Sequence, residues 1–166
     1  MAGGPGWWAG KLRQTARYVT GRVEPLERAE LTIWLTPKEL ALFDAMHRAD
    51  RRHGLDVVAT LRGEGATDPE LLTAGLLHDA GKGDTGLAPR VIHALAVAYG
   101  EPIRAAGSWL PGMRAPLLRM RDHAERSAEL ARVAGCSMRT VELIRWQDAP
   151  RDPVDGERLR LADEAN

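Results

Sequence analysis

The chain has 166 residues, of which 44% are hydrophobic, and its 23 Lys and Arg residues balance its 23 Asp and Glu residues, so the net charge is zero. This composition supports the core of one domain and excludes a disordered or collagen-like chain, and the charge balance gives no basis for general nucleic-acid binding. A single cysteine, Cys136, excludes an internal disulfide and a cysteine-based zinc site.

Membrane-spanning and secretory segments are not expected in this chain. No apolar run approaches the roughly 20 residues that a membrane-spanning helix needs. The first residues also lack the charged start and apolar middle of a secretory signal. We therefore expect a cytoplasmic protein that does not bind membranes.

The composition predicts an all-α fold. Ala, Leu, Arg and Glu dominate, and β-branched residues never cluster into alternating runs. We expect residues 1–9, which are rich in Gly, to be a mobile segment. Residues 10–166 are expected to form a compact single-domain helical bundle.

Helix-start and helix-stop residues divide this bundle into segments. Thr36-Pro37-Lys38-Glu39 is a capping box with Pro at the first helical position, and Asp68-Pro69-Glu70 caps a later helix. The stretch that holds Pro102, Pro111 and Pro116 is expected to be looser. In chain order, helices are expected over residues 10–23, 26–34, 37–48, 51–62, 69–81, 89–99 and 122–135, then after Ser137, and from about Asp155 to the end.

The most informative segment is Leu76-Leu77-His78-Asp79-Ala80-Gly81-Lys82, which places an imidazole and a carboxylate side by side at the end of an apolar helix. Adjacent helical residues point about 100° apart, so both side chains can touch one ion that lies beyond the helix end. Burying such a pair is costly unless a charge compensates it, and a divalent cation does this well. The alternative is a hydrogen-bonded polar pair at a helix C-terminus.

Two further residues could complete a metal site, although each is a weak signal alone. His53 lies at the start of the preceding helix, and Asp163 lies on a short apolar-flanked helix with its carboxylate on the inward side. A lone His near an apolar face is more often a core residue than a ligand, and a lone Asp on a helix is usually solvated.

The order of His53, then His78-Asp79 followed by Gly81-Lys82, then Asp163 resembles the H…HD…D signature of the HD-domain metal-dependent phosphohydrolases. The resemblance spans residues 40–166. It implies an all-α HD-type domain in which two His and two Asp residues hold one divalent metal ion, and these would be His53, His78, Asp79 and Asp163. The implied activity is hydrolysis of a phosphomonoester or phosphodiester in a small nucleotide-like substrate.

The implied donor set of imidazoles and carboxylates suits Mn²⁺, Fe²⁺, Co²⁺, Ni²⁺ or Mg²⁺, with water in the open positions. Such a metal lowers the pKa of a bound water and neutralises a phosphoryl oxygen. We expect Asp79 to orient or deprotonate that water, and Lys82, just past the helix end, to reach a substrate phosphate. The alternative for Lys82 is a solvated lysine favoured by the helix dipole.

The segment around His123, Arg121-Asp122-His123-Ala124-Glu125, resembles the part of two-metal HD proteins in which a His begins a helix. In those proteins a further His, often a pair, follows one helix later, where this chain has Trp146-Gln147. Trp cannot bind a metal and Gln is a poor ligand for transition metals. We therefore expect one metal, with His123 as a substrate-facing or general-acid residue. Two alternatives stay open: His123 is an ordinary residue at a helix N-terminus, or Asp148 restores a ligand.

Arg52 and Arg145 are the remaining residues expected to face the substrate phosphate, whereas His93, on an apolar helix, is expected to be structural. Two other classes of function stay open. One is a catalytically weak or inactive HD-fold module that binds metal and nucleotide for sensing or for docking a partner, which the Trp146-Gln147 departure favours. The other is a helical domain whose His-Asp pair is purely structural.

Overall fold

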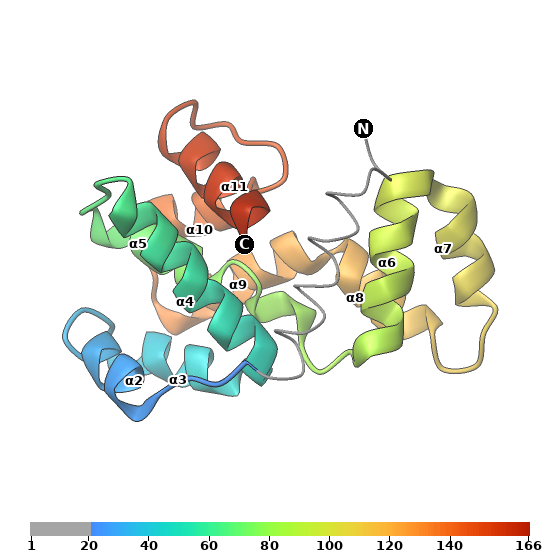
Figure 1. Cartoon of the computed structure of the whole chain (residues 1–166), viewed down its shortest axis with the longest axis horizontal. Coiled ribbons are helices and arrows are strands. Elements are labelled where there is room, and N and C mark those ends of the chain that lie inside the picture. The colour runs from blue at the N-terminus through green and yellow to red at the C-terminus, as the bar shows by residue number, and fades with distance from the viewer. Residues whose placement is uncertain (1–20) are drawn as a thin grey trace.

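The structure is a computed structural model that describes residues 21–166 of the chain. This part of the chain consists of helices that are joined by short loops (Figure 1). These residues form ten α-helices and one 3-10 helix and contain no strand, which confirms the all-α prediction. None of these helices is both long and apolar enough to cross a membrane. The expected mobile segment over residues 1–9, and residues 10–20 of the first expected helix, lie outside the described residues, and residues 21–23 are not helical. The helices are α2 (Pro25–Leu31), α3 (Pro37–Ala45), α4 (Arg48–Gly63), α5 (Pro69–Leu77), η1 (Ala80–Lys82, the 3-10 helix), α6 (Leu87–Tyr99), α7 (Glu101–Ser108), α8 (Arg114–Arg121), α9 (His123–Ala134), α10 (Met138–Arg145) and α11 (Asp155–Ala165).

Several helices begin where the sequence predicts caps. The Thr36 hydroxyl accepts a hydrogen bond from the backbone N–H of Glu39, and the Glu39 carboxylate accepts one from the N–H of Thr36, which completes the capping box of α3. The side chains of Asp68 and Ser137 accept similar bonds at the starts of α5 and α10. These bonds satisfy N–H groups that have no partner within the helix.

The boundary between α3 and α4 differs from the prediction. His47 is not helical, and its Nδ1 accepts a hydrogen bond from the backbone N–H of Ala49, so it caps the next helix. α3 therefore ends at Ala45 rather than at Arg48, and α4 begins at Arg48 rather than at Arg51. As a result, His53 lies in the second turn of α4 and not at its start.

The end of α5 also differs from the prediction. The helix ends at Leu77 rather than Gly81, with His78 as its C-cap, and Asp79 leads directly into η1. The backbone N–H of Gly81 donates to the hydroxyl of Ser127 in α9 at 2.8 Å. This contact with α9 docks η1 and separates it from α5, so the His-Asp pair lies in a turn.

The stretch that holds Pro102, Pro111 and Pro116 is mostly helical, so the expectation of a looser segment is wrong. It contains α7 and α8, which are separated by a short connection through Pro111. Pro102 and Pro116 lie in the first turns of these helices. A proline in the first turn loses no helical hydrogen bond, because the N–H groups there have no acceptor within the helix.

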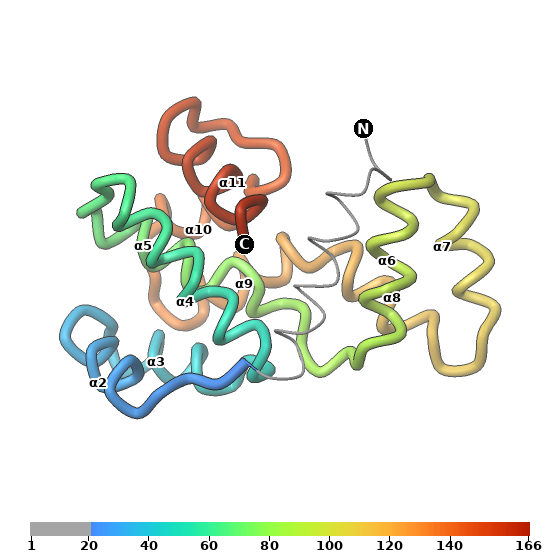
Figure 2. Tube along the Cα trace, viewed as in Figure 1, coloured from blue at the N-terminus to red at the C-terminus, as the bar shows by residue number. Residues whose placement is uncertain are grey.

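α5 is the centre of the hydrophobic core. Every residue from Leu71 to Leu77 is buried, and α4, α10 and α11 pack against this helix. Figure 2 shows the chain from α2 to α5 at one end of the view, and α6 and α7 as a hairpin at the other end, where α8 packs against both. The turn after α5 leads from the core toward that hairpin.

Two glycines let segments that are distant in sequence approach closely. A Cβ at Gly54 of α4 would lie 2.4 Å from the carbonyl oxygen of Leu76, and a Cβ at Gly81 would lie 2.5 Å from that of His123. Neither position has room for a side chain, since both neighbours are backbone atoms. α4 therefore packs directly on the last turn of α5, and α9 packs directly on η1.

Arg139 of α10 joins three helices through carboxylates. Its guanidinium contacts Asp68 before α5, Glu70 in the first turn of α5 at 3.2 Å, and Asp155 at the start of α11 at 2.5 Å. Burial alone would raise the pKa of Asp68, but the hydrogen bond from Arg139 lowers it below its usual value. The cluster ties the first turns of α5 and α11 to α10.

We expect Arg139→Gln to lower the free energy of unfolding at neutral pH by about 1 kcal/mol, since partly exposed ion pairs contribute little more. Because the folded-state pKa of Asp68 is lowered, its stabilisation is complete above the unfolded pKa of about 3.9 and is lost as the pH falls through the folded value. Urea unfolding of the wild type and of Arg139→Gln should show that the difference between their free energies of unfolding shrinks below about pH 4. An equal difference in acid and at neutral pH would contradict the ion-pair assignment.

Candidate metal centre

The four side chains expected to bind a metal converge from three parts of the chain. His53 comes from α4, His78 and Asp79 come from the turn after α5, and Asp163 comes from α11. His53 Nε2 and Asp163 Oδ1 lie 2.7 Å apart, although 110 residues separate them in the sequence. The structure thus brings together the residues that the H…HD…D pattern selects.

Three of these four side chains have donor atoms that are spaced for one ion. His78 Nε2 lies 3.4 Å from Asp163 Oδ1 and 3.5 Å from Asp79 Oδ1. His53 Nε2 lies 3.9 Å from Asp79 Oδ2, and one donor atom from each of His53, His78 and Asp163 lies within 4.8 Å of the other two. Metal–ligand bonds of about 2.1 Å put neighbouring ligand atoms about 3 to 4 Å apart, so His53, His78 and Asp163 fit around a single divalent ion. Asp79 is not among the described residues whose donor atoms gather in this way, so its role as a fourth ligand stays a prediction.

Two buried atoms that face each other in the cluster, His78 Nε2 and Asp79 Oδ1, have no hydrogen-bond partner within residues 21–166. The Nδ1–H of His78 donates to the carbonyl oxygen of Gly75 at 2.8 Å, which orients the ring and turns Nε2 toward the carboxylates. Histidines that bind metals commonly donate their other N–H to a backbone carbonyl in this way. Buried polar atoms are nearly always satisfied, so this pair requires either a proton on His78 Nε2 or a ligand that both atoms can bind.

The charges of the cluster stabilise one another against burial. Burial alone would lower the pKa of His78, but the carboxylates of Asp79 and Asp163 raise it to about 9. Burial would raise the pKa of both carboxyls, yet the charge on His78 holds each well below its usual value. The carboxylates therefore require positive charge beside His78 Nε2, which either a proton or a metal ion can supply.

Lys82 belongs to the cluster through an ion pair with Asp79. Its Nζ donates to Asp79 Oδ2 at 2.5 Å, and its side chain is only 19% exposed. Burial would lower the pKa of Lys82, but Asp79 and Asp50 raise it above its usual value. The alternative of a solvated lysine is therefore wrong, whereas a contact with a substrate phosphate stays a prediction.

His123 and Gln147 extend the cluster beyond Asp79. His123 Nε2 lies 3.6 Å from Asp79 Oδ1 and 3.2 Å from Gln147 Nε2. Burial and the charge of Lys82 lower the pKa of His123, which favours its neutral form. His123 is thus more than an ordinary residue at a helix N-terminus, because its imidazole reaches the expected metal ligands.

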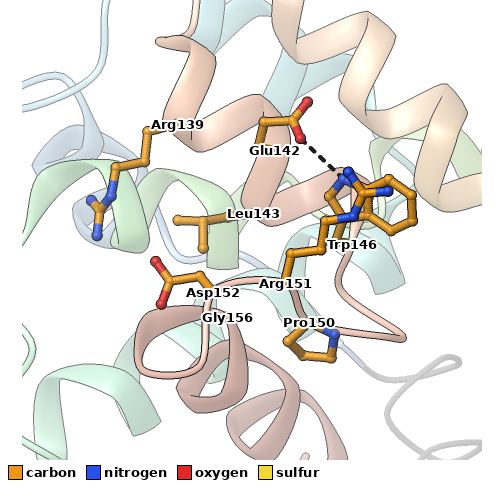
Figure 3. A pocket seen from close by; sticks show the side chains of 8 residues that line it. All are labelled: Arg139, Glu142, Leu143, Trp146, Pro150, Arg151, Asp152 and Gly156. Carbon is orange, nitrogen blue, oxygen red and sulfur yellow. Dashed lines mark hydrogen bonds between the residues drawn. The ribbon is translucent and has the colours of Figure 1, made fainter.

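Trp146 lines a different cavity. Its Nε1–H donates to Glu142 at 3.0 Å, and the guanidinium of Arg151 stacks over its ring at 3.4 Å. Figure 3 shows these residues around a cavity of about 260 Å³ next to α10, which none of the four cluster residues lines. Asp148 is not among the described residues whose donor atoms gather for a metal, although its charge acts on His123.

The two arginines expected to face phosphate are each held by two carboxylates. Within residues 21–166, neither guanidinium forms an ion pair with Asp79 or Asp163, so their phosphate-facing role stays a prediction. The partners are Glu27 and Asp56 for Arg52, and Glu125 and Glu142 for Arg145.

Two residues that the sequence analysis did not select, Asp50 and Arg90, lie beside the cluster, as does His93, which it expected to be structural. The buried carboxylate of Asp50 accepts two hydrogen bonds of 2.6 Å from Arg90 of α6, and its charge acts on Lys82. His93 lies one turn further along α6, and its ring centroid is 6.5 Å from that of His123. Arg90 and His93 are three residues apart, so both lie on one face of α6. This spacing was the only feature of the sequence that could have indicated that the two residues act together.

Comparison of the chain with protein-family models, curated proteins and solved structures gave no match. The candidate metal centre therefore rests on the donor chemistry and geometry of the chain itself, and the HD-domain resemblance stays a prediction.

Asp163→Asn should weaken Mn²⁺ binding more than about 10-fold, because a neutral amide replaces a charged ligand. Glu164→Gln is the matched control, since it neutralises the next residue, an exposed acid paired with Arg160, and should bind Mn²⁺ like the wild type. Calorimetric titration and elemental analysis of the full chain give the affinity and the expected stoichiometry of one. Equal binding by both variants would contradict the ligand assignment.

Lys82→Met should lower the Tm of the metal-free protein, but it should increase the stabilisation that the protein gains on binding Mn²⁺. Without the ammonium, the buried Asp79 carboxylate loses its counter-ion, which costs about 3 kcal/mol. Mn²⁺ then no longer competes with lysine for Asp79, so it should raise the Tm of this variant more than that of the wild type. Lys38→Met, at an exposed position, is the control, and equal Tm increases in all three proteins would show that Lys82 does not compete with metal.

Proposed function

We propose that this chain is an HD-type metal-dependent phosphohydrolase that cleaves a phosphomonoester or phosphodiester bond in a small nucleotide-like molecule. The observation that carries the proposal is the pair of buried atoms without partners, His78 Nε2 and Asp79 Oδ1, which face each other at 3.5 Å beside His53 and Asp163. The order of these four residues along the chain supports the HD type. A cytoplasmic location is part of the proposal, and the buried free thiol of Cys136 suits a reducing compartment.

A divalent ion held by His53, His78, Asp79 and Asp163 would polarise a phosphoryl oxygen and acidify a water molecule. Two imidazoles among the four donors favour Mn²⁺, Fe²⁺, Co²⁺ or Ni²⁺ over Mg²⁺, which prefers oxygen ligands. Lys82 donates to Asp79 Oδ2, whereas Asp79 Oδ1 accepts no hydrogen bond within residues 21–166. Asp79 Oδ1 would then orient the attacking water.

The cluster is open on the side of Asp163. The side chains of Asp163 and His53 are 41% and 20% exposed, whereas those of His78 and Asp79 are 1% and 2% exposed. A substrate phosphate would therefore approach along α4 and α11. Arg52 precedes His53 on α4 and would supply positive charge on this side once phosphate displaces Glu27 or Asp56, which hold its guanidinium.

A second candidate is a module with the same fold that binds metal and nucleotide for sensing or for docking a partner. Two observations favour it: Lys82 is hydrogen-bonded to Asp79, and Gln147 lies against His123. Groups that hydrolysis would use are thus already engaged within the protein. Bound metal without turnover would distinguish this module from the enzyme.

The wild type loaded with Mn²⁺ should hydrolyse p-nitrophenyl phosphate, bis-p-nitrophenyl phosphate or a nucleotide from a panel of mono-, di- and cyclic phosphates. His78→Ala and Asp79→Ala should lose the metal and at least about 100-fold in kcat/KM, because Lewis acidity contributes several kcal/mol to such reactions. Circular dichroism should show that both variants keep their helices.

Asp84→Ala is the control for this experiment, since it removes an exposed carboxylate from the loop after η1 and should leave turnover unchanged. Stoichiometric metal in both His78→Ala and Asp79→Ala would contradict the ligand assignment. Metal in the wild type with no turnover on any substrate would favour the binding module. A wild type that takes up no Mn²⁺ would leave a purely structural cluster.

A further inference from the structure

The cavity beside α10 is separate from the candidate metal centre (Figure 3). Its volume of about 260 Å³ is close to the lower end of the roughly 300–1,000 Å³ range of small-molecule sites. Its residues come from α10, from the loop that follows and from the start of α11, and none of them belongs to the His-Asp cluster. The chemistry of this lining therefore decides what the cavity can bind.

Four charged side chains line this cavity, and three of them are already engaged within the protein. Arg139 pairs with three carboxylates, and Glu142 pairs with Arg145. Asp152 Oδ1 accepts hydrogen bonds of 2.9 Å from two backbone N–H groups around the start of α11. The fourth is Arg151, whose guanidinium has no ion pair and no hydrogen bond within residues 21–166.

Trp146 holds the guanidinium of Arg151 in place. The guanidinium lies 3.4 Å from the centre of the Trp146 ring, whose Nε1–H donates to Glu142 at 3.0 Å, and Figure 3 shows the two side chains stacked at the cavity. The other oxygen of Glu142 pairs with Arg145. A stacked guanidinium uses its face, so the N–H groups along its edge can still form two parallel bonds to an oxyanion. Arg151 is thus a pre-oriented cation with unused donors.

The rest of the lining is mostly apolar. Leu143 is 4% exposed, and Trp146 and Pro150 add further carbon surface. An inorganic anion would leave this apolar surface in contact with water. A ligand without charge would cover the guanidinium edge of Arg151 and leave its donors without an acceptor. The ligand that satisfies both parts of the lining combines an oxyanion with a compact apolar body.

We propose that this cavity binds a small organic oxyanion whose phosphate or carboxylate group pairs with Arg151. Its apolar body, no larger than a single ring system, packs against Leu143 and Pro150. Phosphate and carboxylate share the geometry that lets a guanidinium bind two oxygens at once. The proposal does not rest on the proposed function, because it requires no metal and no residue of the His-Asp cluster.

The indole N–H of Trp146 reports on this cavity in 1H–15N spectra of the full-length protein in EDTA, and its signal is assigned by its loss in Trp146→Phe. Phenyl phosphate and benzoate share a ring and differ in the oxyanion. At least one of them should shift this signal, and the tighter one identifies the oxyanion. Benzyl alcohol and inorganic phosphate each supply one part of the ligand, so both should bind at least about 10-fold more weakly. No shift with either aromatic anion, or equal affinity for a partial ligand, overturns the proposal.

Arg151→Gln should weaken binding of the tighter aromatic anion at least about 10-fold, because an uncharged amide replaces the guanidinium at an exposed position. Arg62→Gln is the matched control, since Arg62 also lies over a tryptophan ring, that of Trp34, at 5.5 Å, and should bind like the wild type. Arg52→Gln, next to His53, should also bind like the wild type. Unchanged binding in Arg151→Gln, or a loss in Arg52→Gln, overturns the proposal. Mn²⁺ binding and turnover are measured separately, so either proposal can fail without the other.

Discussion

A carboxylate buried at the end of an apolar helix is the constraint on which the rest of this structure depends. Asp79 is 2% exposed and remains ionised, although an isolated charge removed from water costs more than the whole stability of a domain. His78 and Lys82 lie beside it and supply the compensating positive charge. Lys82 reaches it because η1 turns the chain back after α5.

The site is built by close approach of backbones as much as by its polar residues. Gly54 follows one expected ligand, His53, and Gly81 lies two residues after another, Asp79. Both glycines contact backbone atoms of the neighbouring segment, so α4 and α9 approach the turn after α5 more closely than side chains would permit. The ligand positions and the glycines are therefore one structural unit, and a methyl group at either glycine would displace the donors.

The hydrogen bonds around the cluster make its donor atoms point to a common place. The Gly75 carbonyl orients His78, Lys82 takes one oxygen of Asp79, and Gln147 lies against His123. The cluster contains two His-Asp pairs that differ: His53 Nε2 and Asp163 Oδ1 bond to each other at 2.7 Å, whereas His78 Nε2 and Asp79 Oδ1 remain 3.5 Å apart without a hydrogen bond. The second pair is the one that a metal ion would satisfy.

The sequence by itself determined the helical class and the caps of α3, α5 and α10, because composition and capping are local properties, and its resemblance to the H…HD…D pattern selected the four residues of the cluster. Only the tertiary structure decided where α5 ends, that α7 and α8 are helices, that Lys82 pairs with Asp79, and that Gln147 contacts His78 and His123. The docking of η1 on α9 and the Gln147 contacts with His78 and His123 join residues that are far apart in the chain, and their free energies exist only once the helices have packed.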